Sequence, residues 1–430
     1  MRKGFLLIAV YGVVAVLTIL GSALILKVAS EKNLIEREKR TLQAFYCAEA
    51  GLDRGMVWLR DQPFPPSGID SISPSQLQNV DLELGVFSVT INPYENNLTA
   101  YLSRYKIISR GIVRGIEKVL TLDVTVDSFA RYAYFTDDEH FRWGWWKIPV
   151  WFVNNDRIGG PNQTNSHYHI YGEPIFDGMS KTADNFMYYY YDGYIYSYPS
   201  GFPTTDNPQF NQGITLGVEP LKMPSKALDL KTAAVHSGLH LETPTTIVLK
   251  EDGTMDVTNA KEGWDNENMP LPSNGAVFVT GGDVYVSGVL KGQLSIGTNR
   301  NIVVTNNILY ADDPIINPNS TDVLGLIAER DVIIDDSAPY DLEINASIMA
   351  LGDSFTVENW WAGPPKGTLA VLGGIIQKER GPVGTFSGAT GEKLSGYSKN
   401  YDYDQRLINQ TPPHYPATGD YIVVLWKKGG

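Results

Sequence analysis

An apolar segment near the N-terminus constrains this chain more than any other feature. Phe5 to Leu26 is a run of 22 residues without a charge. As an α-helix, such a run is about 33 Å long and matches the hydrocarbon core of a bilayer. Arg2 and Lys3 precede it, so the positive-inside rule keeps residues 1–4 cytoplasmic and sends the remainder outward. The segment predicts a single-pass membrane protein with an exported ectodomain.

A cleaved secretory signal is the alternative interpretation of this segment. Val28-Ala29-Ser30 has the small residues of an exit site. The apolar run is longer than the core of an ordinary signal, however, and Lys27 interrupts its end. We therefore expect the segment to stay in place as an anchor.

The residues that follow predict a continuation of the same helix. No proline occurs from Glu31 to Leu59, and charges recur at helical spacing, as in Lys32/Glu36 and Glu36/Arg40. We expect one helix to about Arg60, with the single cysteine, Cys47, as a packing residue inside it. One face carries apolar residues at steps of three, four or seven, and we expect it to pack on a folded domain: Leu42, Phe45, Leu52, Met56 and Leu59.

Two motifs in this helix resemble the N-terminal region of PilX-like minor pilins and related pseudopilins. They are Gly4-Phe5 at its start and Ala44-Phe45-Tyr46-Cys47-Ala48-Glu49-Ala50-Gly51-Leu52, with Ala48, Glu49, Ala50 and Gly51 as its most characteristic part. In that family, prepilin peptidase removes a short basic leader that ends in glycine. The apolar helix then embeds in the bacterial inner membrane and packs in a filament core. By position, the resemblance implies cleavage between Gly4 and Phe5.

Ala9 departs from the pattern of the major pilins, which carry a glutamate at this fifth mature position. A carboxylate in an apolar core is tolerated only when it is paired, and a neighbour's N-terminal ammonium is the partner that the resemblance implies. Ala9 cannot take that role. The chain therefore resembles a minor, tip or initiating subunit of a type IV pilus or related secretion filament, whose partners are the membrane and other pilin-like subunits. The alternative is an anchored envelope protein that never polymerises and binds glycans or proteins.

The ectodomain begins with a small predicted sheet. A linker rich in Pro and Ser, residues 62–74, precedes strand-like runs at 85–92, 104–113 and 118–126. The last run alternates apolar and polar residues strictly, as a half-buried antiparallel strand does. We expect a leader at 1–4, a pilin-like helix at 5–61, a small antiparallel sheet at 75–128 that covers the helix, and a large β-rich domain at 130–430.

The C-terminal half predicts a mainly β fold in which short strands stack as coils. Helical spacers are missing, and each run is too short for a stable lone hairpin, so a parallel β-solenoid is expected, with a β-sandwich as the alternative. One short helix is predicted at 227–235. The expected strands lie at 276–280, 283–286, 293–296, 302–305, 323–328, 332–334, 342–350 and 368–376.

This half also resembles a bacterial domain family of unknown function (DUF4900-like), which supplies no activity and no catalytic residues. The matching segments are Gly159-Gly160-Pro161, Thr164-Asn165, Leu324-Gly325-Leu326-Ile327-Ala328, Gly373-Gly374-Ile375-Ile376-Gln377-Lys378, Gly396-Tyr397-Ser398-Lys399-Asn400-Tyr401-Asp402-Tyr403-Asp404 and Pro412-Pro413.

Exposed aromatic side chains are the candidates for surface binding. Trp143, Trp145, Trp146 and Tyr188-Tyr189-Tyr190-Tyr191 contain more rings than one strand face can bury, which favours contacts with glycans or proteins. The alternative is that these rings pack inside the protein. With 35 basic and 48 acidic residues, the net charge is −13 and disfavours nucleic acid.

Metal and catalytic motifs are weak in this sequence. His167 and His169 would share one strand face, but no third ligand stands near them, and no metal or other cofactor is expected. Calcium at the acidic turns is the alternative: Asp137-Asp138-Glu139, Asp312-Asp313, Asp335-Asp336 and Asp402/Asp404. We expect a structural and interaction protein rather than an enzyme, and a glycan-active enzyme on the same scaffold is the remaining alternative.

Overall fold

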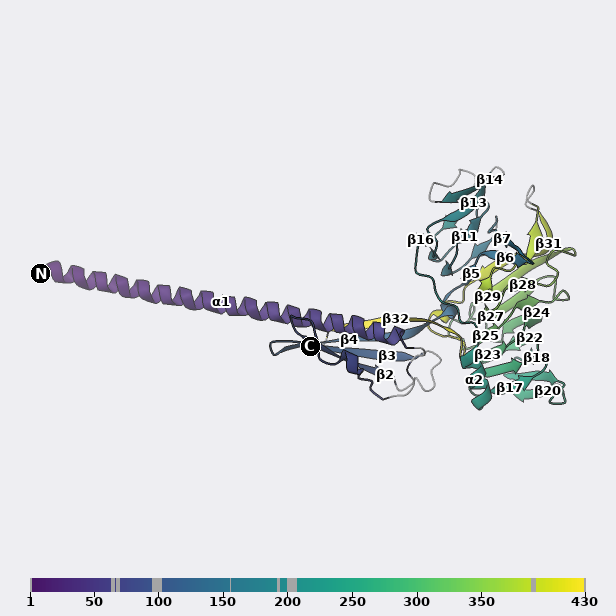
Figure 1. Ribbon diagram of the computed structural model, residues 1–430, viewed down its shortest axis with the longest axis horizontal. Helices are drawn as coiled ribbons and strands as arrows, with labels where there is room; N and C mark the ends of the chain where they lie inside the picture. Colours follow the sequence, from purple (N-terminus) through teal and green to yellow (C-terminus); the bar gives the residue numbers. More distant parts are fainter. Residues whose placement is uncertain are drawn as a thin grey trace. The chain divides into compact units, whose positions relative to one another are not determined.

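The protein is mainly β with one long N-terminal helix (Figure 1). The computed structural model describes residues 2–62, 66, 70–94, 103–154, 156–191, 194–198, 207–387 and 392–428, and of residues 2–6, 8, 9, 191, 194 and 198 it describes the backbone. The chain divides into two compact units. Unit 1 comprises Met1–Val126 with Asp420–Gly430, and unit 2 comprises Asp127–Gly419.

Unit 1 consists of helix α1 (Arg2–Arg60) and an antiparallel sheet. The helix is unbroken over 59 residues, which corresponds to about 88 Å. Its C-terminal half contacts β2 (Val86–Pro93) and β3 (Arg104–Val113). The sheet order is β1-β2-β3-β4-β32, where β1 is Val80–Asp81, β4 is Ile116–Ser128 and β32 is Ala417–Lys428.

The seam between α1 and the sheet is made of small residues, which corrects the expected stripe of large ones. Leu52 and Leu59 are buried, but Leu42 is 53% exposed, and Phe45 and Met56 are only half-buried. The remaining buried positions of the seam are small: Ala44, Cys47, Ala48, Gly51 and Gly55.

Close approach of the helix to the sheet explains this composition. A Cβ atom on Gly51 would lie 2.1 Å from Ser109 Oγ, and one on Gly111 of β3 would lie 2.2 Å from the carbonyl oxygen of Ala44. Real Cβ atoms do not approach other heavy atoms so closely, so a leucine has no room at this seam.

Unit 2 is built from long series of parallel strand pairs. The first series runs, in spatial order, through β17 (Leu239–Glu242), β21 (Ala276–Thr280), β23 (Gln293–Thr298), β25 (Val323–Ala328), β27 (Leu342–Ala350), β29 (Pro365–Glu379), β5 (Tyr134–Asp138), β9 (Asn162–Thr164), β12 (Ser180–Thr182) and β16 (Ile214–Leu216). The second runs through β18 (Thr245–Leu249), β22 (Val284–Leu290), β24 (Ile302–Tyr310), β26 (Val332–Ile334) and β28 (Phe355–Val357). The third continues from β22, β24, β27 and β29 to β31 (Lys393–Asp402), β8 (Arg157–Ile158), β11 (Ile175–Phe176) and β15 (Gln209–Phe210).

Smaller elements decorate these series. Antiparallel pairs are β6 (His140–Trp143) with β7 (Trp146–Pro149), β19 (Thr254–Asn259) with β18 and β20 (Trp264–Pro270), and β30 (Gly384–Phe386) with β31. A separate sheet joins β10 (His169–Ile170), β13 (Met187–Tyr191) and β14 (Tyr194–Tyr198). The helices are α2 (Leu228–Ser237), close to the expected 227–235, and the 3₁₀ turns η1 (Ser75–Leu77), η3 (Phe129–Arg131) and η4 (Gln405–Ile408).

The chain enters unit 2 in the middle of these series rather than at an end. β5 pairs with β29, in the register Ile375↔Tyr134, so segments about 240 residues apart lie side by side (Figure 1). From β5 the chain proceeds outward to β16, and after α2 it returns from β17 towards β29. We refer to the contact of β5 and β8 with β29 and β31 as the junction. The candidate site lies beside it.

Candidate functional site

Three histidines from two separate segments meet beside the junction. His140 begins β6, directly after the end of β5 at Asp138. His167 and His169 follow β9, and His169 is in β10, opposite Tyr188 of β13. The ring centroids of His140 and His169 are 4.8 Å apart, as are those of His167 and His169. One ring nitrogen from each histidine lies within 4.8 Å of those of the other two.

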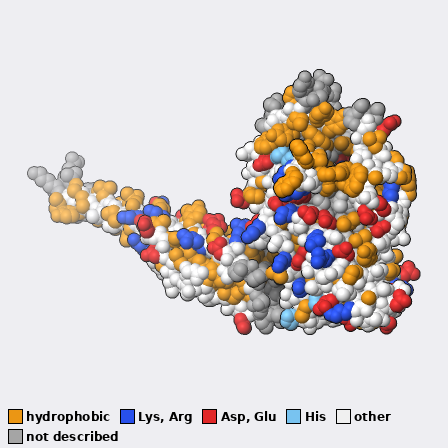
Figure 2. Space-filling view, turned by 45° about the vertical axis from the view of Figure 1, so that its right-hand side comes forward, with side chains coloured by type: hydrophobic (Ala, Val, Ile, Leu, Met, Phe, Trp, Pro, Cys, Tyr) orange, Lys and Arg blue, Asp and Glu red, His pale blue; other side chains and the backbone are white. Residues whose placement is uncertain are grey.

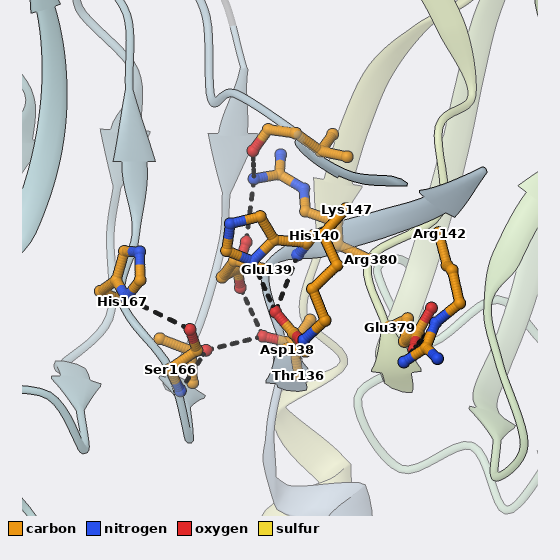
Figure 3. Close-up of polar contacts among 12 residues, drawn as sticks. Thr136, Asp138, Glu139, His140, Arg142, Lys147, Ser166, His167, Glu379 and Arg380 are labelled. Atoms are coloured by element: carbon orange, nitrogen blue, oxygen red, sulfur yellow. Dashed lines mark hydrogen bonds and ion pairs between the residues drawn. The ribbon is translucent and has the colours of Figure 1, made fainter. Parts of the chain in front are cut away.

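Carboxylates orient two of the three rings. Nδ1 of His140 is 2.6 Å from Oδ1 of Asp138, and Nδ1 of His167 is 2.8 Å from Oδ2 of Asp184. A carboxylate accepts a hydrogen bond from an N–H group, so in the neutral ring Nδ1 carries the proton and Nε2 carries the lone pair. Figure 3 shows His140 over Asp138, with Lys147 bonded to the same carboxylate.

The third ring, His169, is almost fully buried, with 3% of its surface exposed. Its Nδ1 and the Nε2 of His167 are both buried and have no hydrogen-bond partner within the protein. Burial, together with His167 and His140, lowers the pKa of His169 to about 3. The ring is therefore neutral and can offer a lone pair at ordinary pH.

Asp138 stays ionised beside this cluster. Burial by itself would raise the pKa of Asp138, but hydrogen bonds from His140 and Lys147 outweigh it and hold the pKa of this carboxyl well below its usual range. The cluster thus has a fixed negative charge next to one of its rings.

A buried ion pair supports the site from beneath. Arg380 Nη1 donates to Glu139 Oε2 at 3.0 Å, and the two side chains are 3% and 0% exposed. Arg380 also donates to the carbonyl of Val150 at 2.9 Å and lies 3.5 Å from the ring centre of Phe152. Tyr134 and Thr136 of β5 donate their hydroxyls to Glu139. Since Arg380 follows β29, this pair joins the two sides of the junction.

The β6–β7 hairpin presents the exposed tryptophans. Trp143 pairs with Trp146 across its tip, and Trp143, Trp145 and Trp146 are 46%, 102% and 76% exposed. Trp143 packs edge-on against Trp360 and Trp361, at centroid distances of 5.6 and 5.3 Å. Hydrophobic side chains gather on one part of the surface of unit 2, and a histidine lies at their edge (Figure 2). We call these five tryptophans the tryptophan surface.

The tyrosine run does not belong to that surface, which corrects its assignment as a set of surface-binding residues. Tyr189 is 5% exposed and stacks on Tyr196, and Tyr188 and Tyr190 are half-buried. Tyr188 instead packs its ring against His167 at 4.9 Å. The strand alternates its side chains between two packed neighbours, so few of its rings reach the surface. The side chain of Tyr191 lies outside the described residues.

The predicted residues of the N-terminal helix lie in unit 1. Gly4, Phe5 and Ala9 are in the α1 backbone, and the described side chains do not include them. Of the family-like motif, Ala48 and Gly51 are buried in the seam, whereas Glu49 and Ala50 are half-buried.

The acidic turns bind their own backbone and neighbours. Asp313 accepts from the amide of Ile315, Asp335 from that of Ser337, and Asp404 pairs with Arg406.

His140 is the residue that sequence reasoning missed as a third ligand. The register of β5 with β9 places Thr136 opposite Thr164, an offset of 28 residues. The same offset carries His140 to the level of Tyr168, between His167 and His169. Once the offset is known the grouping follows, but no local motif in the sequence reveals it.

Comparisons with known proteins give a partial picture. A family described as a domain of unknown function (DUF4900) matches residues 100–184, which include all three histidines. Of the segments that resemble this family in the sequence, Gly159-Gly160-Pro161 and Thr164-Asn165 lie inside the match, and those from residue 324 onward lie outside it. The crystal structure of the competence-associated pilin ComZ from Thermus thermophilus is similar at 13% identity over 91% of this chain and 97% of that chain, with a TM-score of 0.35. No curated protein sequence matches.

Proposed function

We propose that this chain is a minor pilin-like subunit of a type IV pilus or related secretion filament, anchored by residues 5–26 and displaying unit 2 outside the cell. The observation that carries the proposal is the form of α1. It is one unbroken helix whose N-terminal half is long and apolar enough to cross a membrane and whose C-terminal half packs on an antiparallel sheet. The sequence resemblance of both halves to PilX-like subunits supports the same function.

The exposed apolar residues of α1 beyond the membrane length support packing against other helices. Val28, Leu34, Ile35, Leu42 and Tyr46 are each more than half exposed. A solvated helix rarely presents so much apolar surface, whereas a helix that adjoins neighbouring subunits would bury it. A groove of about 570 Å³ on this face of unit 1 is lined by Leu34, Arg37, Glu38, Thr41, Leu42, Phe45, Lys118 and Lys428.

We further propose that Gly4 and Phe5 flank a prepilin-type cleavage site and that Ala9 restricts the subunit to a tip or initiating position. Ala9 has no carboxylate with which to neutralise the N-terminal ammonium of a neighbour in an apolar core. A subunit at the end of a filament has fewer such neighbours.

For unit 2 we propose a β-solenoid that acts in adhesion or surface interaction rather than in catalysis. The three parallel strand series support the solenoid, since each strand pairs with the equivalent strand of the next coil. The tryptophan surface supports a role in binding, because amphipathic rings contribute large contact areas to glycans and proteins.

Mass spectrometry of the native N-terminus tests the proposal. We expect a mature protein that begins at Phe5, carries an N-methyl group and co-purifies with sheared filaments. A Gly4→Val variant should retain residues 1–4, and Ala9→Glu serves as a control that leaves the processing site intact. A mature N-terminus near Glu31 would refute the anchor. A protein that begins at Phe5 but never co-purifies with filaments would refute the filament assignment and leave an anchored binding protein.

A further inference from the structure

We propose that His140, His167 and His169 form a binding site for a divalent transition metal ion, with zinc as the best fit. Three neutral imidazoles with an open fourth position are a ligand set that zinc accepts, and nickel and copper also bind imidazole. The site is independent of the filament assignment.

The positions of the ligand atoms suit such an ion after a small adjustment. In a tetrahedral site with Zn–N bonds of about 2.0–2.1 Å, two ligand nitrogens are about 3.4 Å apart. The three nitrogens here lie within 4.8 Å of one another. Rotation of the rings by a few tenths of an ångström to an ångström at each nitrogen closes the difference, and the backbone does not have to move.

Two unpartnered nitrogens point to a ligand and not to a satisfied histidine core. Nε2 of His167 and Nδ1 of His169 are buried without a hydrogen-bond partner in the protein. Buried polar atoms are nearly always satisfied, so two such atoms within one cluster are unusual. A metal ion would accept both lone pairs at once.

The surrounding carboxylates complete the pattern of a metal site. His140 and His167 each offer Nδ1 to a carboxylate, Asp138 and Asp184 respectively, and turn Nε2 towards the cluster. Metal-bound histidines usually donate their second nitrogen in this way, which fixes the ring and raises its basicity. The nearby cations are already paired, Lys147 with Asp138 and Arg380 with Glu139, so they do not oppose a divalent ion as free charges.

Binding would fasten the tryptophan hairpin to the body of unit 2. His140 begins the β6–β7 hairpin, whereas His167 and His169 belong to the segment that carries β10. One ion would therefore crosslink these two segments beside the exposed Trp145 and Trp146. The fourth coordination position is left for water or for an oxygen or nitrogen donor from a surface that the protein meets.

Metal titration of the full-length protein in detergent tests the site. After treatment with a chelator, we expect one zinc ion per chain to bind with a micromolar or lower Kd. Cobalt(II) should give the visible absorption of a tetrahedral site. His140→Gln and His167→Gln should each weaken binding by about 100-fold or more, because each removes one of three ligands. His236→Gln is the matched control, since His236 is an exposed histidine of α2 that bonds to the carbonyl of Thr232.

The outcomes separate cleanly. Zinc bound at one equivalent and lost in both cluster variants, but retained in the control, supports the proposal. Binding that occurs only at millimolar zinc, or that persists unchanged in the His140→Gln variant, overturns it. The cobalt spectrum of the unaltered protein keeps the test valid if a variant folds poorly, since an octahedral spectrum or no visible band would also overturn it.

Discussion

The buried pair of Glu139 and Arg380 gives the sharpest prediction about stability. Glu139→Gln keeps the size of the side chain and removes its charge, so that Arg380 is left buried without a counter-ion. A guanidinium cannot lose its proton to escape this situation. Breaking a buried pair on one side costs about 3–5 kcal/mol, and the 0% and 3% exposure of these two side chains places this pair in that range.

Arg380→Met removes more contacts but leaves a less costly remainder. The change deletes the bonds of Arg380 to Glu139 and to the carbonyl of Val150, and its stacking on Phe152. Glu139, however, keeps the hydroxyls of Tyr134 and Thr136 as donors and can also be neutralised by a proton. We therefore expect the loss to be no larger than that of Glu139→Gln. A double variant with apolar residues at both positions should lose less than the sum of the two, by about 1 kcal/mol or more.

Thermal unfolding followed by near-ultraviolet circular dichroism measures these losses, in excess chelator so that bound metal does not contribute. For a unit of this size, about 3–5 kcal/mol corresponds to a fall in Tm of about 6–20 °C. The neighbouring pair Arg142–Glu379 is the matched control (Figure 3), because Arg142 is 58% exposed and its loss should cost about 1 kcal/mol or less. A Glu139→Gln protein that unfolds within a degree or two of the unaltered one would refute the reasoning.

Three further predictions concern the seam, a buried acid and the surface. Gly111→Ala places a Cβ 2.2 Å from the backbone of Ala44 and should destabilise unit 1 by about 2 kcal/mol or more in thermal unfolding, whereas Ser109→Ala, which removes a buried hydroxyl without a partner, should be nearly neutral. Burial raises the pKa of Asp331 to about 6 from 3.8, so the folded state holds the extra proton between these values and its stability falls as the pH rises through them. Asp331→Asn should therefore stabilise the protein at pH 8 by at most about 3 kcal/mol in urea unfolding and have little effect at pH 4. Trp145→Ala should leave Tm unchanged within about 1–2 °C, because the ring is fully exposed, but reduce retention on the surfaces to which the protein adheres.

The long helix and most strands of the C-terminal half could be predicted because their signals are local. An uncharged run followed by a proline-free amphipathic segment leaves few alternatives to one helix, and α1 ends at Arg60. The strands at 276–280, 323–328, 332–334 and 342–350 have the expected bounds, since turn residues delimit them clearly.

The packing face of α1 was harder to predict, because hydrophobic periodicity ranks large residues first. At this seam the spacing between helix and sheet is the deciding factor, and it favours Ala48, Gly51 and Gly55 over Leu42. A pattern that weights size as apolarity cannot detect close approach. The signal that was present is the recurrence of small residues every three or four positions from Ala44 to Gly55.

The histidine site depends on an order of coils that no local pattern encodes. β5 lies next to β29 although about 240 residues separate them, and the segment between them goes out and returns. Pairing at this distance is set by the fit of whole coils. His140 was therefore assigned no partner, while His167 and His169, two residues apart, were recognised as neighbours.

The distribution of buried polar groups suggests how the coils find their order. The strands β25 and β27 are filled mainly with Ile, Leu, Val, Met and Ala, and such coils stack on one another with little preference for a particular partner. At the junction the buried residues include Glu139 paired with Arg380 and Asp156 paired with Lys399, across 241 and 243 residues. A coil stacked in the wrong place would leave these charges buried and unpaired, a penalty that apolar coils cannot impose. The junction should therefore contribute more to correct order than to total stability. On this reasoning, an apolar double replacement of Glu139 and Arg380 should still give a compact unit 2 but a broader unfolding transition and faster proteolysis within residues 134–216. An unaltered, sharp transition in that variant would mean that the apolar coils define their order alone.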